Sequence, residues 1–198
     1  MKVNKNWILI GGTILTAFLI YSLFAGSYNK MVNYDETVIT AWSNVENVYQ
    51  RRADLIPNLV NTVKGYASHE KETLTGVIEA RSKATSVNID ASNLTAESMQ
   101  RFQQAQKGLS SALSKLMVVV ERYPDLKANQ NFLELQSQLE GTENRIAVER
   151  RKFNESVKGY NMYIRSFPRN MVAGVYGFER KIQFTADEGA AKAPEVKF

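Results

Sequence analysis

An uncharged, largely apolar run occupies residues 7–25, whereas most of the chain behind it alternates between polar and apolar residues with helical periodicity. A helix of this length is about 28 Å long, close to the hydrocarbon thickness of a bilayer. The run therefore predicts a transmembrane helix, and we assign residues 1–27 to a membrane anchor. It contains Trp7, Gly12, Thr16 and Ala25. Gly12 and Thr16 form a small-xxx-small pair that suits helix packing in lipid, although both residue types are also ordinary in such helices.

A cleaved signal peptide is the alternative interpretation, because Lys2 and Lys5 precede the run and residues 25–27 (Ala-Gly-Ser) are an acceptable cleavage site. The run is longer than the apolar region of a signal peptide, usually about 7–15 residues, which favours an uncleaved anchor. The positive-inside rule then predicts the orientation, since only Lys30 lies close behind the run. We expect the N-terminus on the cytoplasmic side of the membrane and the soluble domain on the extracytoplasmic side.

Residues 28–168 are patterned as long amphipathic helices, with apolar residues recurring at steps of three and four. Neither proline nor glycine interrupts residues 27–55, so the first of these helices is expected to continue from the anchor. Pro57 either kinks this helix or begins a new one, because proline cannot donate a backbone hydrogen bond. The helical stripe itself continues over residues 50–84. A kink predicts a bundle of three helices, and a turn predicts four.

Residues 85–96 are rich in Ser, Thr, Asn and Asp and predict a loop, with Asn93 or Thr95 as the N-cap of the next helix. A second long helix follows the loop, and a third begins near Asn129 and stops at Pro168. The predicted fold class is all-α. A single N-terminal transmembrane helix is followed by an antiparallel bundle of three or four long helices.

Residues 169–184 are glycine-broken and aromatic, and we expect them to pack on the bundle because their apolar side chains are costly to leave in water. These side chains are Met171, Val172, Val175, Tyr176 and Phe178. Residues 185–198 contain few bulky side chains and predict a disordered tail.

Charged residues crowd the middle of the last helix, where Thr142 and Glu149 stand in place of expected apolar residues, and a second charged cluster lies in the first bundle helix. The candidate set is Arg51, Arg52 and Asp54 in the first bundle helix, and Glu143, Arg145, Glu149 and Arg150 in the last. One interpretation is a solvated helix face with weak ion pairs between residues four apart. The other is a buried polar layer that fixes the register of the helices. The residues themselves do not choose between the two.

Little in the chain indicates catalysis, since it has no cysteine and a single histidine, His69. The pair His69-Glu70 matches the start of a zinc-protease helix, but Thr73 stands where the second histidine ligand belongs. His69 is therefore expected on an exposed helix face. The net charge of +5 falls to +3 without Lys2 and Lys5, which is too mild and dispersed to indicate nucleic-acid binding. We expect no enzymatic activity, no metal or cofactor and no nucleic-acid partner.

Two long stretches, residues 47–74 and 113–168, together with the Gly-Phe pair at 177–178, closely resemble the LemA family. The resemblance implies a membrane-anchored, antiparallel helical bundle of bacteria, and hence the bacterial inner membrane. It implies no catalytic residues. The strongest signatures are residues 50–57 and 140–151, which in such a bundle lie on facing helices and favour the buried polar layer.

These features together predict a non-enzymatic envelope protein that acts as an oligomeric scaffold or membrane organiser. The expected partners are the lipid bilayer, further copies of the chain, or another membrane protein. Members of the family are often encoded beside membrane proteins of the TPM-domain kind or a membrane metalloprotease. The alternative function is therefore a signalling or adaptor bundle that regulates such a partner.

Overall fold

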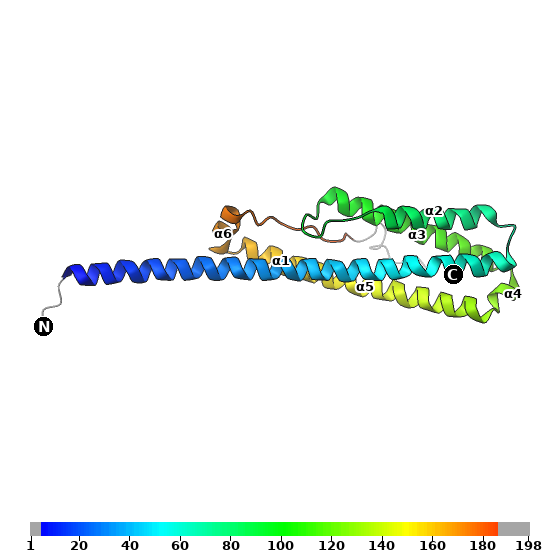
Figure 1. The fold of residues 1–198 in the computed structure, drawn as a ribbon, viewed down its shortest axis with the longest axis horizontal. Coiled ribbons are helices and arrows are strands. Elements are labelled where there is room, and N and C mark those ends of the chain that lie inside the picture. Colours follow the sequence, from blue (N-terminus) through cyan, green and yellow to red (C-terminus); the bar gives the residue numbers. More distant parts are fainter. Residues whose placement is uncertain (1–4, 186–198) are drawn as a thin grey trace, which may run out of the picture.

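The computed structural model describes residues 5–185, and every regular element within that range is an α-helix (Figure 1). The elements are α1 (Lys5–Tyr66), α2 (Lys71–Ser86), α3 (Ala96–Val120), α4 (Pro124–Lys127), α5 (Gln130–Arg165) and α6 (Arg169–Tyr176). The predicted all-α class with a long apolar helix at the N-terminal end is confirmed. Residues 186–198 lie outside the described residues, and they make up nearly all of the expected disordered tail. Lys2 also lies outside them.

The first helix, α1, is continuous over 62 residues, which corresponds to a length of about 93 Å. Its first part contains an 18-residue window of mean hydropathy 1.8, none of which is buried. From Met31 onward one face of the same helix is buried, and Val38 and Trp42 are fully enclosed. A bare apolar stretch and the first helix of the bundle are thus parts of one element.

Pro57 lies inside α1 and does not end it. Of the two alternatives at this proline, continuation of the helix and the start of a new one, the structure shows continuation. Proline lacks the N–H that would bond to the carbonyl four residues earlier, which is that of Ala53. Arg81 of α2 supplies the missing donor, since its Nε lies 2.7 Å from the Ala53 carbonyl oxygen. A side chain from a neighbouring helix therefore satisfies the backbone group that the proline leaves free.

The chain reverses ten residues later instead, between Tyr66 and Lys71, so the expected continuation of the helix to residue 84 is wrong. The sequence pattern does not reveal this turn, because buried apolar residues continue across it. Val63 lies before the turn, Ala67 within it and Leu74 after it, and all three are buried. His69 lies in the turn rather than on a helix face, and it is exposed. With the reversal, α1, α2, α3 and α5 form a bundle of four helices.

In the bundle, α5 packs antiparallel along α1, and the α2–α3 hairpin covers the end farther from the N-terminus (Figure 1). The core consists of two apolar clusters. The near cluster, on the side of the bare part of α1, includes Met31, Val38, Trp42, Val45, Tyr49, Phe102, Phe153, Val157, Tyr160 and Phe184. The far cluster includes Ile56, Leu59, Val60, Val63, Val77, Leu109, Leu116, Leu126 and Phe132. On α1 the boundary between them falls between Tyr49 and Ile56.

Residues 177–185, the C-terminal segment, run without regular structure and are bound by two asparagines of α5. The Asn161 amide accepts from the N–H of Lys181 at 2.9 Å and donates to its carbonyl oxygen at 2.8 Å. Asn154, seven residues earlier, does the same for Phe184 at 2.8 and 3.1 Å. The backbone of the segment is thereby held against α5, and the Phe184 side chain enters the near cluster.

The short helix α6 differs in part from the expectation that its apolar side chains cover the bundle. Val172 is buried as expected, and Phe178 packs against the near cluster. Met171, Val175 and Tyr176 are instead exposed. A helix of eight residues with apolar side chains all round has only one face in contact with the bundle.

The contact between Arg81 and the Ala53 carbonyl predicts a specific coupling with Pro57. Arg81→Ala is expected to lower the free energy of unfolding by about 1–3 kcal/mol, because a partly buried carbonyl loses its only donor. In a Pro57→Ala background the restored N–H bonds to that carbonyl, so the same change should cost clearly less. Denaturant unfolding of the four proteins, followed by circular dichroism, measures the cycle. Equal costs in the two backgrounds would contradict the proposed role of Arg81.

Candidate functional site

A single guanidinium, that of Arg52, lies at the boundary between the two apolar clusters of the core. Its side chain is only 3% exposed. Nη1 donates to both carboxylate oxygens of Glu143 on α5, at 2.8 and 3.0 Å, and to the hydroxyl of Ser110 on α3, at 3.0 Å. Nη2 donates to Oε1 of Gln106 on α3, at 2.6 Å. Arg52 of α1 is thus bonded to two other helices at once.

The fourth helix joins through Gln106, whose Nε2 donates to the carbonyl oxygen of Ala84 near the end of α2, at 3.2 Å. Arg52, Gln106, Ser110 and Glu143, with the Ala84 carbonyl, are called the Arg52 cluster below. Each of the four bundle helices contributes to it. Because every contact requires one axial position of its helix, the cluster restricts how the helices can slide past one another.

The energetics of the cluster favour a role in specificity over a role in net stability. Removing a guanidinium from water is costly, and a single ion pair rarely returns more than that cost. Glu143 stays half exposed, with 50% of its side chain accessible, so its charge remains hydrated. Nε of Arg52 is buried without a hydrogen-bond partner among the described residues. The cluster therefore favours one helix register, and its net contribution to the free energy of folding is small.

The structure brings only Arg52 and Glu143 of the candidate polar set together. Arg51 and Arg145 are exposed, and Asp54 accepts from Gln50 at 2.8 Å on the surface of α1. The set thus divides between the two interpretations: Arg52 is buried and pairs with the half-exposed Glu143, whereas these three lie on solvated faces.

The last two members of the set, Glu149 and Arg150, lie roughly two turns further along α5 than Glu143. Glu149 pairs with Lys152 of its own helix at 2.9 Å. The guanidinium of Arg150 lies 4.7 Å from the centre of the Phe184 ring and donates to the Thr185 carbonyl oxygen at 3.3 Å. Arg150 therefore helps to bind the C-terminal segment and does not join the Arg52 cluster.

Sequence reasoning missed Gln106 and Ser110, although Gln106 carried a signal. Gln106 occupies a position in the apolar stripe of α3, four residues after Phe102 and three before Leu109, and it is buried as they are. A polar side chain in such a position needs a partner inside the bundle. Arg52 likewise occupies a position in the apolar stripe of α1, three residues after Tyr49 and four before Ile56. Ser110 carries no comparable pattern.

Tyr49 lies one turn before Arg52 and packs against it, with the guanidinium carbon 5.1 Å from the centre of the ring. Burial raises the pKa of the Tyr49 hydroxyl above its usual value, and the positive charges of Arg150 and Arg52 oppose that rise. The phenol therefore stays neutral at ordinary pH, and its ring face favours the adjacent cation. A cavity of about 300 Å³ beside these side chains is lined by Tyr49, Arg52, Gln106, Glu143 and Arg150, among others.

The anchor residues are bare within the part of the chain that the structure describes. Trp7 is 72% exposed. The Thr16 hydroxyl donates to the Gly12 carbonyl oxygen of its own helix at 2.9 Å, so it needs no partner from outside. A side-chain carbon added at Gly12 would meet no atom within 4 Å. The small-residue face of α1 is therefore open to contact. Ala25, at the end of the apolar run, is partly covered.

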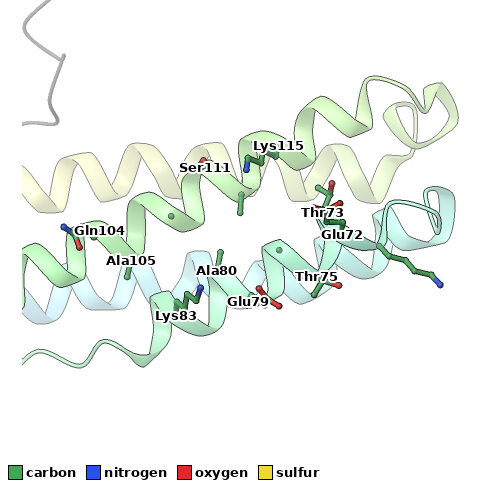
Figure 2. Close-up of a pocket in the computed structure, with 14 residues that line it drawn as sticks. Glu72, Thr73, Thr75, Glu79, Ala80, Lys83, Gln104, Ala105, Ser111 and Lys115 are labelled. Atoms are coloured by element: carbon green, nitrogen blue, oxygen red, sulfur yellow. The ribbon is translucent and has the colours of Figure 1, made fainter.

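The largest groove of the described residues lies between α2 and α3 and has a volume of about 820 Å³. Figure 2 shows Ala80 of α2 and Ala105 of α3 pointing toward one another across it, with the charged ends of Lys83 and Lys115 at its edges. Gly76, Gly108 and Ala112 continue this lining of short side chains. The lining also includes polar and charged side chains, among them Glu72, Glu79 and Gln104. Across residues 5–185, no three acidic or histidine side chains lie close enough to hold a metal ion.

Four helices that meet at one buried guanidinium, one of them extended by a bare apolar stretch of bilayer length, define a helical-bundle protein with an N-terminal apolar extension. The family model described as the LemA family matches residues 41–198. The chain belongs to the LemA family, as its sequence predicted. All four residues of the Arg52 cluster lie inside the matched range, whereas the bare part of α1 precedes it.

Three curated relatives are identical to the chain at about a quarter of the aligned positions. Protein LemA of Metamycoplasma hominis is 26% identical over 160 residues, which is 81% of this chain and 69% of that protein. Magnetosome protein MamQ of Magnetospirillum gryphiswaldense is 26% identical over 201 residues, or 92% of this chain and 72% of that one. Magnetosome protein MamQ 1 of Paramagnetospirillum magneticum is 25% identical over 191 residues, covering 87% and 70%.

The Arg52 cluster predicts that two adjacent arginines differ sharply in their contribution to folding. Arg52→Met is expected to lower the free energy of unfolding by about 2–3 kcal/mol, because it leaves Gln106 and Glu143 without their partner. The value is below the usual cost for a fully buried pair, since Glu143 is half exposed. Arg51→Met, on the exposed side of the same turn, should change stability by no more than about 0.5 kcal/mol.

Denaturant unfolding monitored by circular dichroism measures both variants. The double variant Arg52→Met with Glu143→Leu should recover much of the loss, because an apolar pair then replaces the ion pair. Similar losses at positions 51 and 52 would show that the cluster has no special role.

Proposed function

We propose that the chain is a non-enzymatic, single-pass membrane protein whose bundle serves as an oligomeric scaffold or membrane organiser. The continuity of α1 carries this proposal. One unbroken helix of 62 residues has a bare apolar first part and a bundle face that begins at Met31. With the first part in a bilayer, the bundle is held at a set angle to the membrane surface, as a scaffold requires.

The proposed location is the bacterial inner membrane, with the N-terminus inside and the bundle outside the cytoplasm. The orientation follows from Lys2 and Lys5 before the apolar run against Lys30 behind it. The relatives named as magnetosome proteins support a part in organising a cellular structure rather than in turning over a substrate.

Self-association is the proposed mode of action. Anchoring in two dimensions raises the effective concentration of neighbouring copies. The Gly12–Thr16 face of α1 offers close helix approach without unsatisfied groups, because the Thr16 hydroxyl is bonded within its own helix. Pairing of the anchors through this face leaves the bundles free to meet side by side.

An adaptor function is the second candidate, and the groove between α2 and α3 favours it. The groove carries short side chains such as Ala80 and Ala105, and so its shape suits the ridge of side chains on another helix. In this role the bundle binds and regulates another membrane protein, for which a protease or a TPM-domain protein is the proposed class.

The orientation has a direct test with reporters fused after Phe198. An alkaline phosphatase fusion is expected to be active and a cytoplasmic fluorescent protein fusion dark, because the bundle lies outside. The matched control places each reporter at the N-terminus, where the outcomes should be reversed. A fluorescent C-terminal fusion without phosphatase activity would reverse the proposed orientation.

Self-association through the anchor is testable with single cysteines, since the chain has none of its own. Under mild oxidation in native membranes, Thr16→Cys is expected to form disulfide-linked dimers. Ile14→Cys, on the opposite side of the helix and equally exposed to lipid, should form few. Gel electrophoresis without reductant measures the dimer fraction. Monomer alone at both positions, with monomer alone after a lysine-reactive cross-linker, would refute the oligomer.

A further inference from the structure

A second bare apolar surface lies at the end of the bundle nearest the apolar part of α1. Met171 and Val175, one turn apart on α6, are 58% and 74% exposed, and Phe167, in the turn just before this helix, is 81% exposed. The neighbouring Val172 and Ala173 are buried against the bundle. The chain from residue 167 through α6 therefore has two apolar faces, one covered and one uncovered, and an uncovered face of this kind indicates a binding surface.

The position of α6 along α1 matches the headgroup zone of a bilayer. The Tyr176 ring lies 4.8 Å from the ring of Tyr28, centre to centre, and the Phe178 ring lies 5.7 Å from it. Tyr28 follows the end of the apolar run at Ala25 by three residues, or about 4.5 Å along the helix axis. The headgroup zone is roughly 5–7 Å deep on each side of the hydrocarbon. Figure 1 shows α6 beside α1 at this end of the bundle.

The chain before and within this surface is basic, and the next acidic residue, Glu179, follows Tyr176 by three residues. Between Glu155 and Glu179 the sequence contains no acidic residue, whereas it contains Lys158, Arg165 and Arg169. The Arg169 guanidinium packs over the ring of Tyr163, 4.4 Å from its centre, at the end of α5. Bare apolar side chains next to basic ones, with aromatic rings at their border, are the pattern of a helix that lies in a membrane interface.

We propose that Phe167, Met171, Val175 and Tyr176, called the α6 surface, insert into the headgroup region of the leaflet from which α1 emerges. Anionic phospholipid is the favoured partner of the adjacent Arg165 and Arg169. The inference rests on the proposed function, because it requires the apolar run of α1 to span the bilayer. The chain then touches the membrane at two points, and this prevents rotation of the bundle about the axis of α1.

The charge pattern argues for lipid over a second copy of the chain as the occupant. Symmetric pairing of two α6 surfaces brings Arg165 and Arg169 of each copy close to those of the other, without acidic residues in the same segment to offset them. An anionic leaflet instead attracts the same arginines. These arginines are about 140 residues from the apolar run in sequence, beyond the range over which flanking charges set orientation.

The test uses the full chain with one labelled cysteine, reconstituted in vesicles of phosphatidylcholine and phosphatidylglycerol. Val175→Cys places an environment-sensitive fluorophore on the α6 surface. Val118→Cys, on α3 and 69% exposed, is the matched control at the end of the bundle away from the membrane. Ile14→Cys, on the side of α1 opposite the proposed pairing face and 65% exposed, reports the span itself. Each label is quenched in turn by nitroxide lipids with shallow or deep nitroxides and by aqueous iodide.

The expected result is loss of fluorescence with shallow nitroxide lipids at position 175 and no loss at position 118. Iodide should quench position 118 strongly and position 175 weakly. Quenching of position 175 by iodide to the same extent as position 118 would overturn the inference. Protection of position 175 from both lipid and iodide would also overturn it and would indicate coverage by protein.

Position 14 separates this inference from the proposed function. Quenching at position 14 by deep nitroxide lipids, combined with no lipid quenching at position 175, refutes the α6 surface alone. No lipid quenching at position 14 refutes the membrane span, and the inference falls with it.

Discussion

The buried guanidinium of Arg52 determines how the helices of this protein align along their axes. Apolar stripes alone allow helices to shift by a turn or a heptad with little loss of burial, and the near and far clusters offer such stripes on both sides of the cluster. A charge that must reach both Glu143 and Gln106 removes this freedom. The same alignment sets how far α5 extends back along α1, and therefore the height at which α6 meets Tyr28. A polar contact in the middle of the bundle thus positions a surface at its end.

The sequence predicted those features that depend on local chemistry. Either Asn93 or Thr95 was expected to begin one helix, and a position near Asn129 the next. In the structure Thr95 and Asn129 are the N-caps, and each side chain accepts from the backbone N–H three residues later. The turn at residues 67–70 was not predicted, because buried residues continue the helical period across it. The fate of Pro57 was also beyond sequence reasoning, since it depends on Arg81, whose position in space follows from that unpredicted turn.

The candidate polar site shows the same limit at the level of single residues. Arg51 and Arg52 are adjacent and chemically alike, but successive residues of a helix point about 100° apart, so one faces solvent and the other the core. The binding of the C-terminal segment by Asn154 and Asn161 was equally hidden, although these asparagines are one heptad apart. Their partners are backbone groups, which every residue of the segment offers and which leave no mark in its sequence.

Because α1 is unbroken, the angle of its apolar part determines the position of the far end of the bundle. From Ala25 to its end at Tyr66 the helix extends about 62 Å. With the apolar part in a bilayer, a change of about 10° in the tilt of the span moves the far end of the bundle by roughly 11 Å, because no hinge absorbs the angle. Helix tilt responds to the thickness of the hydrocarbon layer. In the oligomer proposed above, the distal ends of neighbouring bundles would approach or separate when the membrane thins or thickens, so that the thickness of the lipid layer would set a spacing between proteins.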